Sequence, residues 1–547
     1  MDFTADKAAR LRMMAVAAIL GTAFASSALG GDGEKPKAPS SSSSSASKAS
    51  PIDALFLAGL KKANVKPSPE ASDAEFLRRI YLDMLGRIPT VQEAGTFLEA
   101  KEKGKRAKLV DQLLEHPDFS KNFGNEWGII LLGRKNQGRD VDRGELQSWL
   151  RREVAANRPW NEMAFELITA KGSNKENGAV NFTMAHLEDG AINLTSLTTR
   201  AFLGQQIQCT QCHDHPTPPN TWKQADFWSI NAFFKGLRSQ RVMKTDATGA
   251  EVYSHTELRD EPTMDHSTFE QRNALIGVAF PRYLDGTPLP KYGEVNRREE
   301  LGRLITEKDK QQLARAFVNR VWGRFLGRGF VQPVDDFGPH NTPAHPELLD
   351  RLTEDFIASK FDVKALYRTI ASSKAYALSS MNLKENEKDE TLFSHMALKP
   401  MTPEQLFDSL ITATAAHKAG GGDVDGVRKR WLGQFTVTFA NDEEGESSNF
   451  QGTIPQALMM MNGELMNGAT GGKPGSFLHN TLESSRTQRV PARFIVNRLY
   501  LAALGRYPNA SELTNASGFL GTNPDSIAVL EDLFWSLLNC NEFVLNH

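Results

Sequence analysis

The chain has 547 residues, of which 40% are hydrophobic and 24% are charged. This length and composition allow two or three ordinary domains, each with its own core, and exclude a disordered or fibrous protein. Because 64 lysines and arginines nearly balance 66 aspartates and glutamates, the formal charge is only -2, which argues against nucleic acid as a partner.

The first thirty residues have the order of a secretory signal peptide. Lys7, Arg10 and Arg12 precede an apolar run over residues 13–20, and small residues follow. The apolar run is shorter than the roughly 20 residues that a membrane-spanning helix needs. We therefore expect residues 1–30 to be removed, with no stable membrane span afterwards and a periplasmic or secreted product.

The rest of the chain divides by composition into a linker, two helical segments and an insert. Residues 31–51 are rich in Ser, Gly, Lys and Pro and predict a flexible tether. Apolar residues recur at helical spacing over residues 52–236 and again over 298–547, which predicts two helical domains. Between them, residues 237–297 lose this period, so we expect a small irregular or β-containing insert. The fold class predicted is mainly α.

A short pattern occurs three times with identical spacing in the two helical segments. In each copy an apolar and aromatic helix face ends at a glycine suited to a left-handed helix cap. The copies run from Arg79-Ile80-Tyr81 to Leu85-Gly86-Arg87, from Arg320-Val321-Trp322 to Leu326-Gly327-Arg328, and from Arg498-Leu499-Tyr500 to Leu504-Gly505-Arg506. The first and third copies also share a later pair of leucines followed by Phe. The sequence therefore predicts a repeated helical module, whose Arg and aromatic residues we expect to pack neighbouring helices together.

Two of the three cysteines lie in Cys209-Thr210-Gln211-Cys212-His213, the arrangement typical of c-type haem attachment. Two thiols about one turn apart can reach the two vinyl groups of a porphyrin, and the following imidazole can bind the iron. The motif predicts a covalent haem on Cys209 and Cys212 with His213 as an axial ligand. Neighbouring apolar residues could wall such a flat ligand: Phe202, Leu203, Ile207, Trp222, Phe227, Trp228, Phe233 and Phe234.

Two other interpretations of the same cluster stay open. Cys209, Cys212, His213 and His215 are all accepted donors to zinc or another transition metal, although adjacent Cys212 and His213 make one tetrahedron awkward. In an oxidising compartment the two thiols could instead form a local disulfide.

The sixth iron ligand has four candidates in the sequence. Met184 and His186 precede the motif, and Met264 and His266 follow it in the insert. A methionine would raise the reduction potential relative to a second histidine, whereas an absent ligand would leave a position for a small molecule.

A second group of titratable residues occurs in the C-terminal half. Asp335 and Asp336 are followed by His340, Asn341 and His345, which could act as acid and base or hold a metal. Such a stretch is more often a loop that enters a helix, and the Pro-Glu pair after His345 fits a first helical turn. The sequence identifies no catalytic residue.

Two sets of motifs carry a resemblance to known families. The first is similar to the planctomycete cytochrome-associated family of unknown function, and the second resembles its usual C-terminal partner domain. The first set is Phe76-Leu77-Arg78-Arg79-Ile80-Tyr81-Leu82-Asp83 with Gly86 and Pro89, and Gln206-Ile207-Gln208-Cys209 through Cys212-His213-Asp214-His215-Pro216; the second is Val318-Asn319-Arg320-Val321-Trp322, Gly327-Arg328-Gly329, Pro333-Val334-Asp335-Asp336-Phe337 and His345-Pro346-Glu347-Leu348-Leu349.

The resemblance implies a large exported bacterial protein of planctomycetes or their relatives. It strengthens the haem interpretation of the motif at Cys209–His213. The function expected is electron transfer or haem-based sensing in the periplasm, together with an unknown redox partner or other exported proteins. The alternative is a non-haem helical scaffold that binds a partner or a polysaccharide, in which the Cys/His cluster binds another metal or forms a local disulfide.

Overall fold

The computed structural model describes most of the chain after the linker. The described residues are 50–134, 138, 140–215, 222–261, 266–289, 295–419, 423, 426, 428–430, 433, 470–520 and 526–547. The expected signal peptide, nearly all of the expected linker and Met264 lie outside them.

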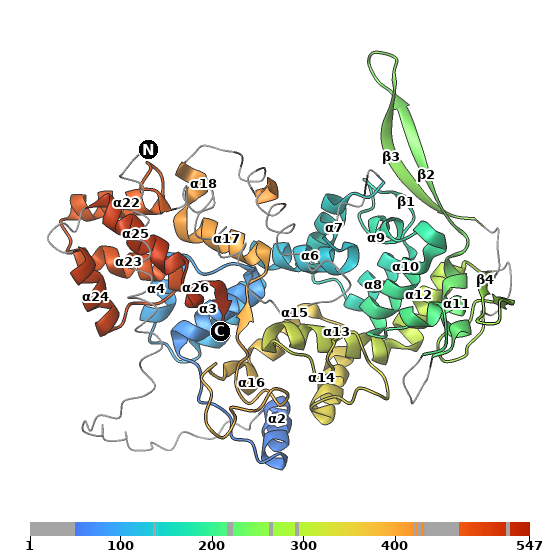
Figure 1. The fold of residues 1–547 in the computed structure, drawn as a ribbon, viewed down its shortest axis with the longest axis horizontal. Coiled ribbons are helices and arrows are strands. Elements are labelled where there is room, and N and C mark those ends of the chain that lie inside the picture. Colours follow the sequence, from blue (N-terminus) through green and yellow to red (C-terminus); the bar gives the residue numbers. More distant parts are fainter. Residues whose placement is uncertain are drawn as a thin grey trace.

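Helices form most of the described structure, as the sequence predicted (Figure 1). Before the insert they are α2 (Pro51–Lys62), α3 (Asp73–Leu85), α4 (Val91–Glu99), α5 (Lys105–Leu114), α6 (Pro117–Leu132), α7 (Arg143–Ala155), α8 (Trp160–Thr169), α9 (Val180–Ala185), α10 (Glu188–Thr198), the π-helix η1 (Thr199–Leu203), the 3-10 helix η2 (Gln208–Gln211), α11 (Gln224–Asn231) and the 3-10 helix η3 (Ala232–Phe234). After it they are α12 (Arg297–Arg303), the π-helix η4 (Leu304–Lys308), α13 (Lys310–Leu326), α14 (Pro346–Ala358), α15 (Val363–Ala371), α16 (Lys374–Ala377), α17 (Pro403–Thr414), α18 (Ala416–Ala419), α22 (Phe477–Gln488), α23 (Ala492–Leu504), α24 (Ala510–Leu520), α25 (Ile527–Leu538) and α26 (Asn541–Val544).

The insert between the two helical segments contains β-structure, also as predicted. The antiparallel hairpin of β2 (Leu237–Thr245) and β3 (Glu251–Asp260) stands away from the helices in Figure 1, and β1 (Gly172–Ser173) pairs with the base of β3. A second, shorter hairpin joins β4 (Ser267–Glu270) to β5 (Ile276–Ala279). A short pair, β6 (Lys399–Pro400) with β7 (Leu545–Asn546), lies outside the insert. In the part of the chain that is described, no helix has the length and apolar character needed to cross a membrane.

The three copies of the repeated pattern form helices α3, α13 and α23, and each ends at the expected glycine. Gly86, Gly327 and Gly505 have φ angles of 71°, 83° and 70°, the left-handed conformation that only glycine adopts without strain. The cap turns the chain sharply at the end of an apolar helix and satisfies a terminal carbonyl: the N–H of Gly86 donates to Leu82 O at 3.2 Å. The prediction of a repeated module is confirmed at this level.

The arginine that follows the cap organises the first copy of the module. Arg87 donates to the carboxylate of Glu93 at 2.9 Å and to that of Asp118 at 2.8 Å, and its guanidinium lies over the ring of Tyr81. Glu93 also belongs to the capping box of Thr90, which starts α4. One side chain therefore fixes the ends of three helices: α3, α4 and α6.

The third copy repeats these contacts. Arg506 donates to Glu512 at 2.7 Å and to Glu542 at 2.6 Å, and it lies over the ring of Tyr500. Asn509 takes the place of the capping residue Thr90. Its backbone N–H donates to the Glu512 carboxylate, and its side-chain oxygen accepts from the backbone N–H of Glu512. The spacing of six residues from arginine to glutamate is the same in both copies. The module is therefore duplicated in structure as well as in sequence.

The middle copy keeps the helix and its cap, but Arg328, which stands where Arg87 and Arg506 stand in the outer copies, forms no ion pair among the described residues. Arg320, on α13, donates to the carbonyl oxygens of Ala201 and Arg200 and lies over the ring of Trp127. This copy therefore connects α13 to the π-helix η1, directly before the cysteine motif.

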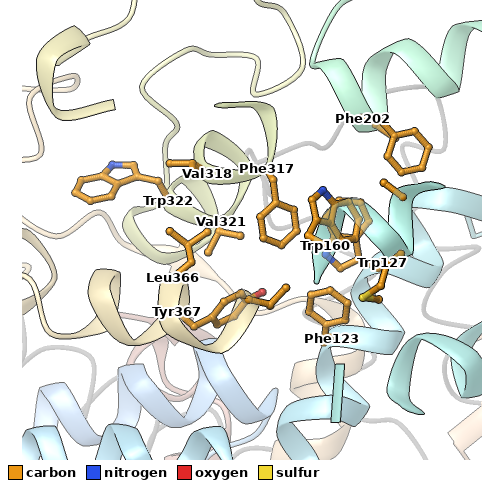
Figure 2. Close-up of a cluster of buried hydrophobic side chains, with 14 of the residues drawn as sticks. Phe123, Trp127, Trp160, Phe202, Phe317, Val318, Val321, Trp322, Leu366 and Tyr367 are labelled. Atoms are coloured by element: carbon orange, nitrogen blue, oxygen red, sulfur yellow. The ribbon is translucent and has the colours of Figure 1, made fainter. Parts of the chain in front are cut away.

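Aromatic side chains join the two helical segments in one continuous core (Figure 2). The ring of Phe317 on α13 lies 4.4 Å from that of Trp160 on α8, which is itself 4.3 Å from Trp127 on α6. This cluster extends from α2 to residue 396 and includes Leu501 of α23, whereas a second cluster gathers residues of α17 and α22–α26 with Leu82, Ile88 and Met401. The domain limits at residues 236 and 298 stay a prediction, and the segments on both sides of them share side-chain packing.

A buried carboxylate at Asp83 connects α3 to two distant parts of the chain. Asp83 is 2% exposed and accepts hydrogen bonds from Lys399 Nζ at 2.7 Å, Tyr376 Oη at 2.8 Å and Asn546 Nδ2 at 2.7 Å. Lys399 also donates to two carbonyl oxygens at the end of α13, and its burial lowers its pKa. A buried ion pair is stable only when such partners satisfy it.

We expect Lys399→Met to lower the free energy of unfolding by about 3–5 kcal/mol, because it leaves the Asp83 carboxylate buried without its counter-charge. The matched control is Lys66→Met. Lys66 forms an exposed pair with Glu385 at 4.0 Å, so its loss should change stability by less than about 0.5 kcal/mol. Urea unfolding followed by circular dichroism measures both, and equal shifts of the two midpoints would contradict the role given to Asp83.

Gly→Ala substitutions at three positions distinguish two costs of a side chain at the module cap: backbone strain and steric overlap. Gly86→Ala should be the most destabilising, since it adds strain of about 1–2 kcal/mol and a Cβ only 2.4 Å from Asn122 Oδ1. Gly104→Ala adds a similar strain with open space around the Cβ. Gly95→Ala, inside α4 and without either penalty, should stabilise the protein by about 0.5–1 kcal/mol. Denaturant midpoints give the order, and a Gly95 variant less stable than the Gly104 variant would refute it.

Candidate functional site

The cysteine motif begins on the 3-10 helix η2, continues through its C-cap residue Cys212 to His213, and exposes both cysteines. A 3-10 helix has roughly three residues per turn, so Cys209 and Cys212 project from the same side. Both are exposed and free, whereas Thr210 between them is buried and donates to Ile207 O at 2.6 Å. The local fold therefore directs the backbone and Thr210 into the protein and leaves the two sulfurs accessible.

His213 is exposed as well, and its ring is oriented by the next residue. Its Nδ1 lies 2.7 Å from the carbonyl oxygen of Asp214. A carbonyl can only accept, so Nδ1 carries the proton and the neutral ring keeps a lone pair on Nε2. This hydrogen bond is the usual second contact of a metal-binding histidine, because it fixes the tautomer and the ring orientation. The motif thus offers two thiols and one Nε2 donor on the surface.

Helix α11 holds the motif in place from one side. The carbonyl of Gln211 accepts hydrogen bonds from Gln224 Nε2 at 3.1 Å and from Trp228 Nε1 at 3.0 Å. Asp214 accepts from the backbone N–H of Gln224 at 2.9 Å and from Lys223 Nζ at 3.1 Å. The hydrogen bond from the Gln224 N–H lowers the pKa of Asp214, so its carboxylate stays charged. Helix α11 therefore fixes the backbone on both sides of Cys212.

A loop from the C-terminal half holds the chain that leads into the motif. Asp335 is 4% exposed, and its carboxylate accepts from Arg200 Nε at 2.9 Å and from Gln206 Nε2 at 2.8 Å. The backbone N–H of Phe337 donates to Gly204 O at 2.8 Å. Asp335 is therefore a buried partner that positions η1 and the motif, not an exposed acid or base.

The same loop brings two histidines together beside the motif. The ring of His340 stacks on that of His215 with 6.0 Å between centroids, and His340 Nε2 lies 3.1 Å from Asp336 Oδ1. Asn341 holds the loop through hydrogen bonds to backbone carbonyls, including that of Asp336. Of the titratable group expected from the sequence, Asp336 and His340 thus lie at the motif.

His345 lies elsewhere. It is buried in the core, where its Nε2 is 3.1 Å from Leu392 O and its ring stacks on Phe393. Burial lowers the pKa of His345. It therefore has no part in a site with Asp336 and His340, and it precedes α14 as a packing residue.

The described candidates for the sixth ligand lie in different surroundings. Met184 is buried within the hydrophobic core. His186 Nε2 is 2.7 Å from Leu131 O, so that nitrogen carries a proton. The rings of His266 and Phe280 are tilted at 57° with 5.8 Å between centroids. His266 directly precedes β4, and the carbonyl of Glu270 at the other end of that strand, about 13 Å along it, accepts from Gln224 beside the motif.

Most of the aromatic and apolar residues expected to wall a flat ligand are core residues instead. Only Trp222 and Trp228 keep partly exposed side chains, and the ring of Trp228 stacks on Phe269. The other six are fully buried: Phe202, Leu203, Ile207, Phe227, Phe233 and Phe234. Their burial fits a role in the hydrophobic core, the other role that apolar residues next to the motif can have.

The structure brings no single-ion metal cluster together at the motif. Within the described ranges, no three His, Cys, Asp or Glu side chains are grouped as metal ligands. His215 stacks its ring on that of His340. The contacts of Trp228, Arg200 and Asp335 could not be predicted from short-range patterns, since each joins residues well separated in the chain.

Two family models match the chain, and both describe domains of unknown function. Residues 51–239 match PSCyt2, "Protein of unknown function (DUF1549)", and residues 297–449 match PSD1, "Protein of unknown function (DUF1553)". Comparisons with curated proteins and with solved structures found no match. The chain therefore contains these two domains in this order, and the candidate site forms where the first, which carries Cys209–His213, meets Asp335–His340 of the second.

A pH titration of stability tests the surroundings described for His186. Burial lowers the pKa of His186, so below about pH 6.5 the unfolded chain binds a proton that the folded chain does not. Stability should therefore fall as the pH drops, by up to about 1.4 kcal/mol per pH unit from this group. His186→Gln keeps a donor for Leu131 O and should reduce the slope between pH 6.5 and 4.5 in urea unfolding. An unchanged slope would mean that His186 is not buried as a neutral ring.

Proposed function

We propose that this chain is an exported c-type haem protein that works in electron transfer or haem-based sensing, with haem bound through Cys209 and Cys212 and His213 as an axial ligand. The observation that supports this most directly is the geometry of the motif. Two exposed thiols lie on one side of a 3-10 turn, and the next imidazole has its Nδ1 hydrogen-bonded to a carbonyl.

The residues of the motif fit a covalently bound porphyrin better than a single metal ion. A haem c takes two sulfurs and one imidazole from such a motif, and the remaining axial position comes from elsewhere or stays open. A structural zinc ion would need a fourth ligand besides the two thiols and the imidazole, and all four would have to converge as a tetrahedron. The exposed sulfurs also allow the attachment reaction, because the two thiols are reachable from solvent.

When bound, the haem would supply one-electron chemistry, and the protein would set its position and surroundings. His213 would direct Nε2 to the iron while Asp214 O holds Nδ1. Trp228 and Gln224 would keep the attachment loop rigid through Gln211 O. The remaining axial position is assigned to no residue. Export to the periplasm, which rests on residues 1–30, is part of the proposal.

The competing function is a non-haem helical scaffold. The projecting β2–β3 hairpin favours it, since such an arm is suited to contact another molecule (Figure 1). In that case the Cys209 and Cys212 thiols would be structural, or would bind another metal, and purified protein would contain no iron.

Expression with the c-type haem attachment machinery separates the two functions. The wild-type band on a denaturing gel should stain for haem peroxidase activity, because a thioether-bound haem survives denaturation. Cys209→Ala with Cys212→Ala should abolish the stain, since both attachment atoms are lost. Iron analysis and the spectrum of the reduced protein give the stoichiometry and bear on axial ligation.

The matched control is Cys540→Ser. Cys540 is the third cysteine, partly buried, with its Sγ 3.1 Å from Leu537 O, and the Ser hydroxyl can keep this contact. This variant should stain like the wild type. A colourless wild-type band without iron would reject the haem proposal and leave the scaffold function.

A further inference from the structure

A cavity lies in the first copy of the repeated module, among helices α3, α4 and α5. Its volume is about 490 Å³, within the roughly 300–1,000 Å³ of small-molecule sites. All of its lining residues fall between residues 81 and 112, so it is separate in sequence from the cysteine motif and from the loop at Asp335. No part of the proposed haem function uses this cavity.

The charged side chains on the cavity wall are already neutralised by ion pairs. The three pairs are Glu93 with Arg87 at 2.9 Å, Lys105 with Asp73 at 2.8 Å, and Lys108 with Glu102 at 3.0 Å. Lys105 Nζ donates in addition to the carbonyl oxygens of Phe97 and Ala100. An ionic ligand would have to compete with these pairs for its counter-charge, so the cavity favours a neutral ligand.

Tyr81 places a hydrogen-bonding group at the cavity that the rest of the described chain does not use. The residue is 4% exposed, and its hydroxyl has no hydrogen-bond partner among the described residues. Burial raises the pKa of Tyr81, so the hydroxyl stays protonated and can donate as well as accept. The hydroxyl oxygen is not among the fully buried atoms that lack a partner, so it is reachable from the cavity and can bond a ligand or water there.

The rim adds further neutral polar groups next to a small apolar surface. Gln92, Thr96 and Gln112 are exposed at the cavity, and their side chains make no hydrogen bond within the described part of the chain. Phe97 and Leu109 are buried beside them, and Lys105 Nζ lies over the Phe97 ring, 4.7 Å from its centroid. The cavity thus combines amide and hydroxyl groups, each able to donate and accept, with a small apolar surface.

We propose that this cavity binds a neutral sugar unit. A pyranose ring presents hydroxyl groups around its edge and C–H groups on its faces, which suits neutral donors and acceptors next to a small apolar surface. A phosphorylated or amino sugar would find no unpaired group of opposite charge on the cavity wall. The third copy of the module differs at this apolar surface, because Ala516 stands four residues after Glu512, where Phe97 stands after Glu93.

The third copy supplies a matched control. Tyr500 occupies the place of Tyr81, with the same arginine over its ring, but it does not line this cavity. Tyr81→Phe removes one hydroxyl at the cavity, and Tyr500→Phe removes the equivalent hydroxyl at the other end of the duplication.

Saturation-transfer-difference NMR on the full chain tests the proposal. The probes are the methyl α-glycosides of glucose, galactose and mannose, with glucose 6-phosphate and glucosamine as charged comparisons. At least one neutral glycoside should receive saturation more strongly than either charged sugar. Tyr81→Phe should weaken its binding about threefold to tenfold, the loss of one hydrogen bond, and Tyr500→Phe should leave it unchanged.

Three results would overturn the proposal: no saturation of any neutral glycoside, stronger binding of the charged sugars, or equal losses in the two tyrosine variants. If Tyr81→Phe alters the circular dichroism spectrum, Gln112→Ala on the exposed rim replaces it with the same expected direction. Haem staining of each variant should not change, so this test and that of the haem proposal can fail independently.

Discussion

The architecture depends on one buried carboxylate, Asp83, near the end of the first repeated helix. A charge at this depth is tolerated only when its oxygens are fully hydrogen-bonded, and its three partners come from residues 376, 399 and 546. The requirement to satisfy Asp83 therefore brings the middle and the end of the described chain to α3. The hydrophobic cores give most of the stability, whereas this cluster specifies which segments meet.

The duplicated module extends this principle to the surface. In each outer copy an arginine directly after a left-handed glycine binds two carboxylates, one at the start of the next helix and one much later in the chain. The two copies also pack against each other, since Arg78 donates to Ala503 O and Phe543 O, and a Cβ on Gly505 would lie 3.3 Å from Pro89. In Figure 1 the C-terminal helices accordingly lie beside α3 and α4. Duplication thus produced a pair of similar units, of which the first has the cavity around Tyr81.

The cysteine motif has a different relation to the fold. Its reactive atoms are exposed, but its backbone is held firmly, by Gln224 and Trp228 on one side and by the Arg200–Asp335 ion pair on the other. Rigid support beneath an accessible surface suits a bound group whose orientation must stay constant while another molecule approaches. Because Asp335 belongs to the second matched domain, the two domains together form the setting of the motif, which gives a physical reason for their occurrence in one chain.

The sequence by itself determined the features that depend on short spacings. Apolar periodicity gave the mainly helical fold and the β-containing insert, the identical spacing of three helix ends gave the repeated module, and Cys209 to His213 gave the candidate site. These are local properties, set by helix geometry and by the backbone freedom of glycine.

Only the tertiary structure decided which residues surround that site. The partners Arg200 and Asp335 are 135 residues apart, His345 lies in the core although it is close in sequence to His340, and six of the eight residues that could wall a flat ligand are buried. The cavity at Tyr81 is likewise formed by three helices whose polar residues look like ordinary surface positions in the sequence. Side-chain burial and long-range pairing depend on how helices pack, and periodicity shows only which face of a helix is apolar, not what covers it.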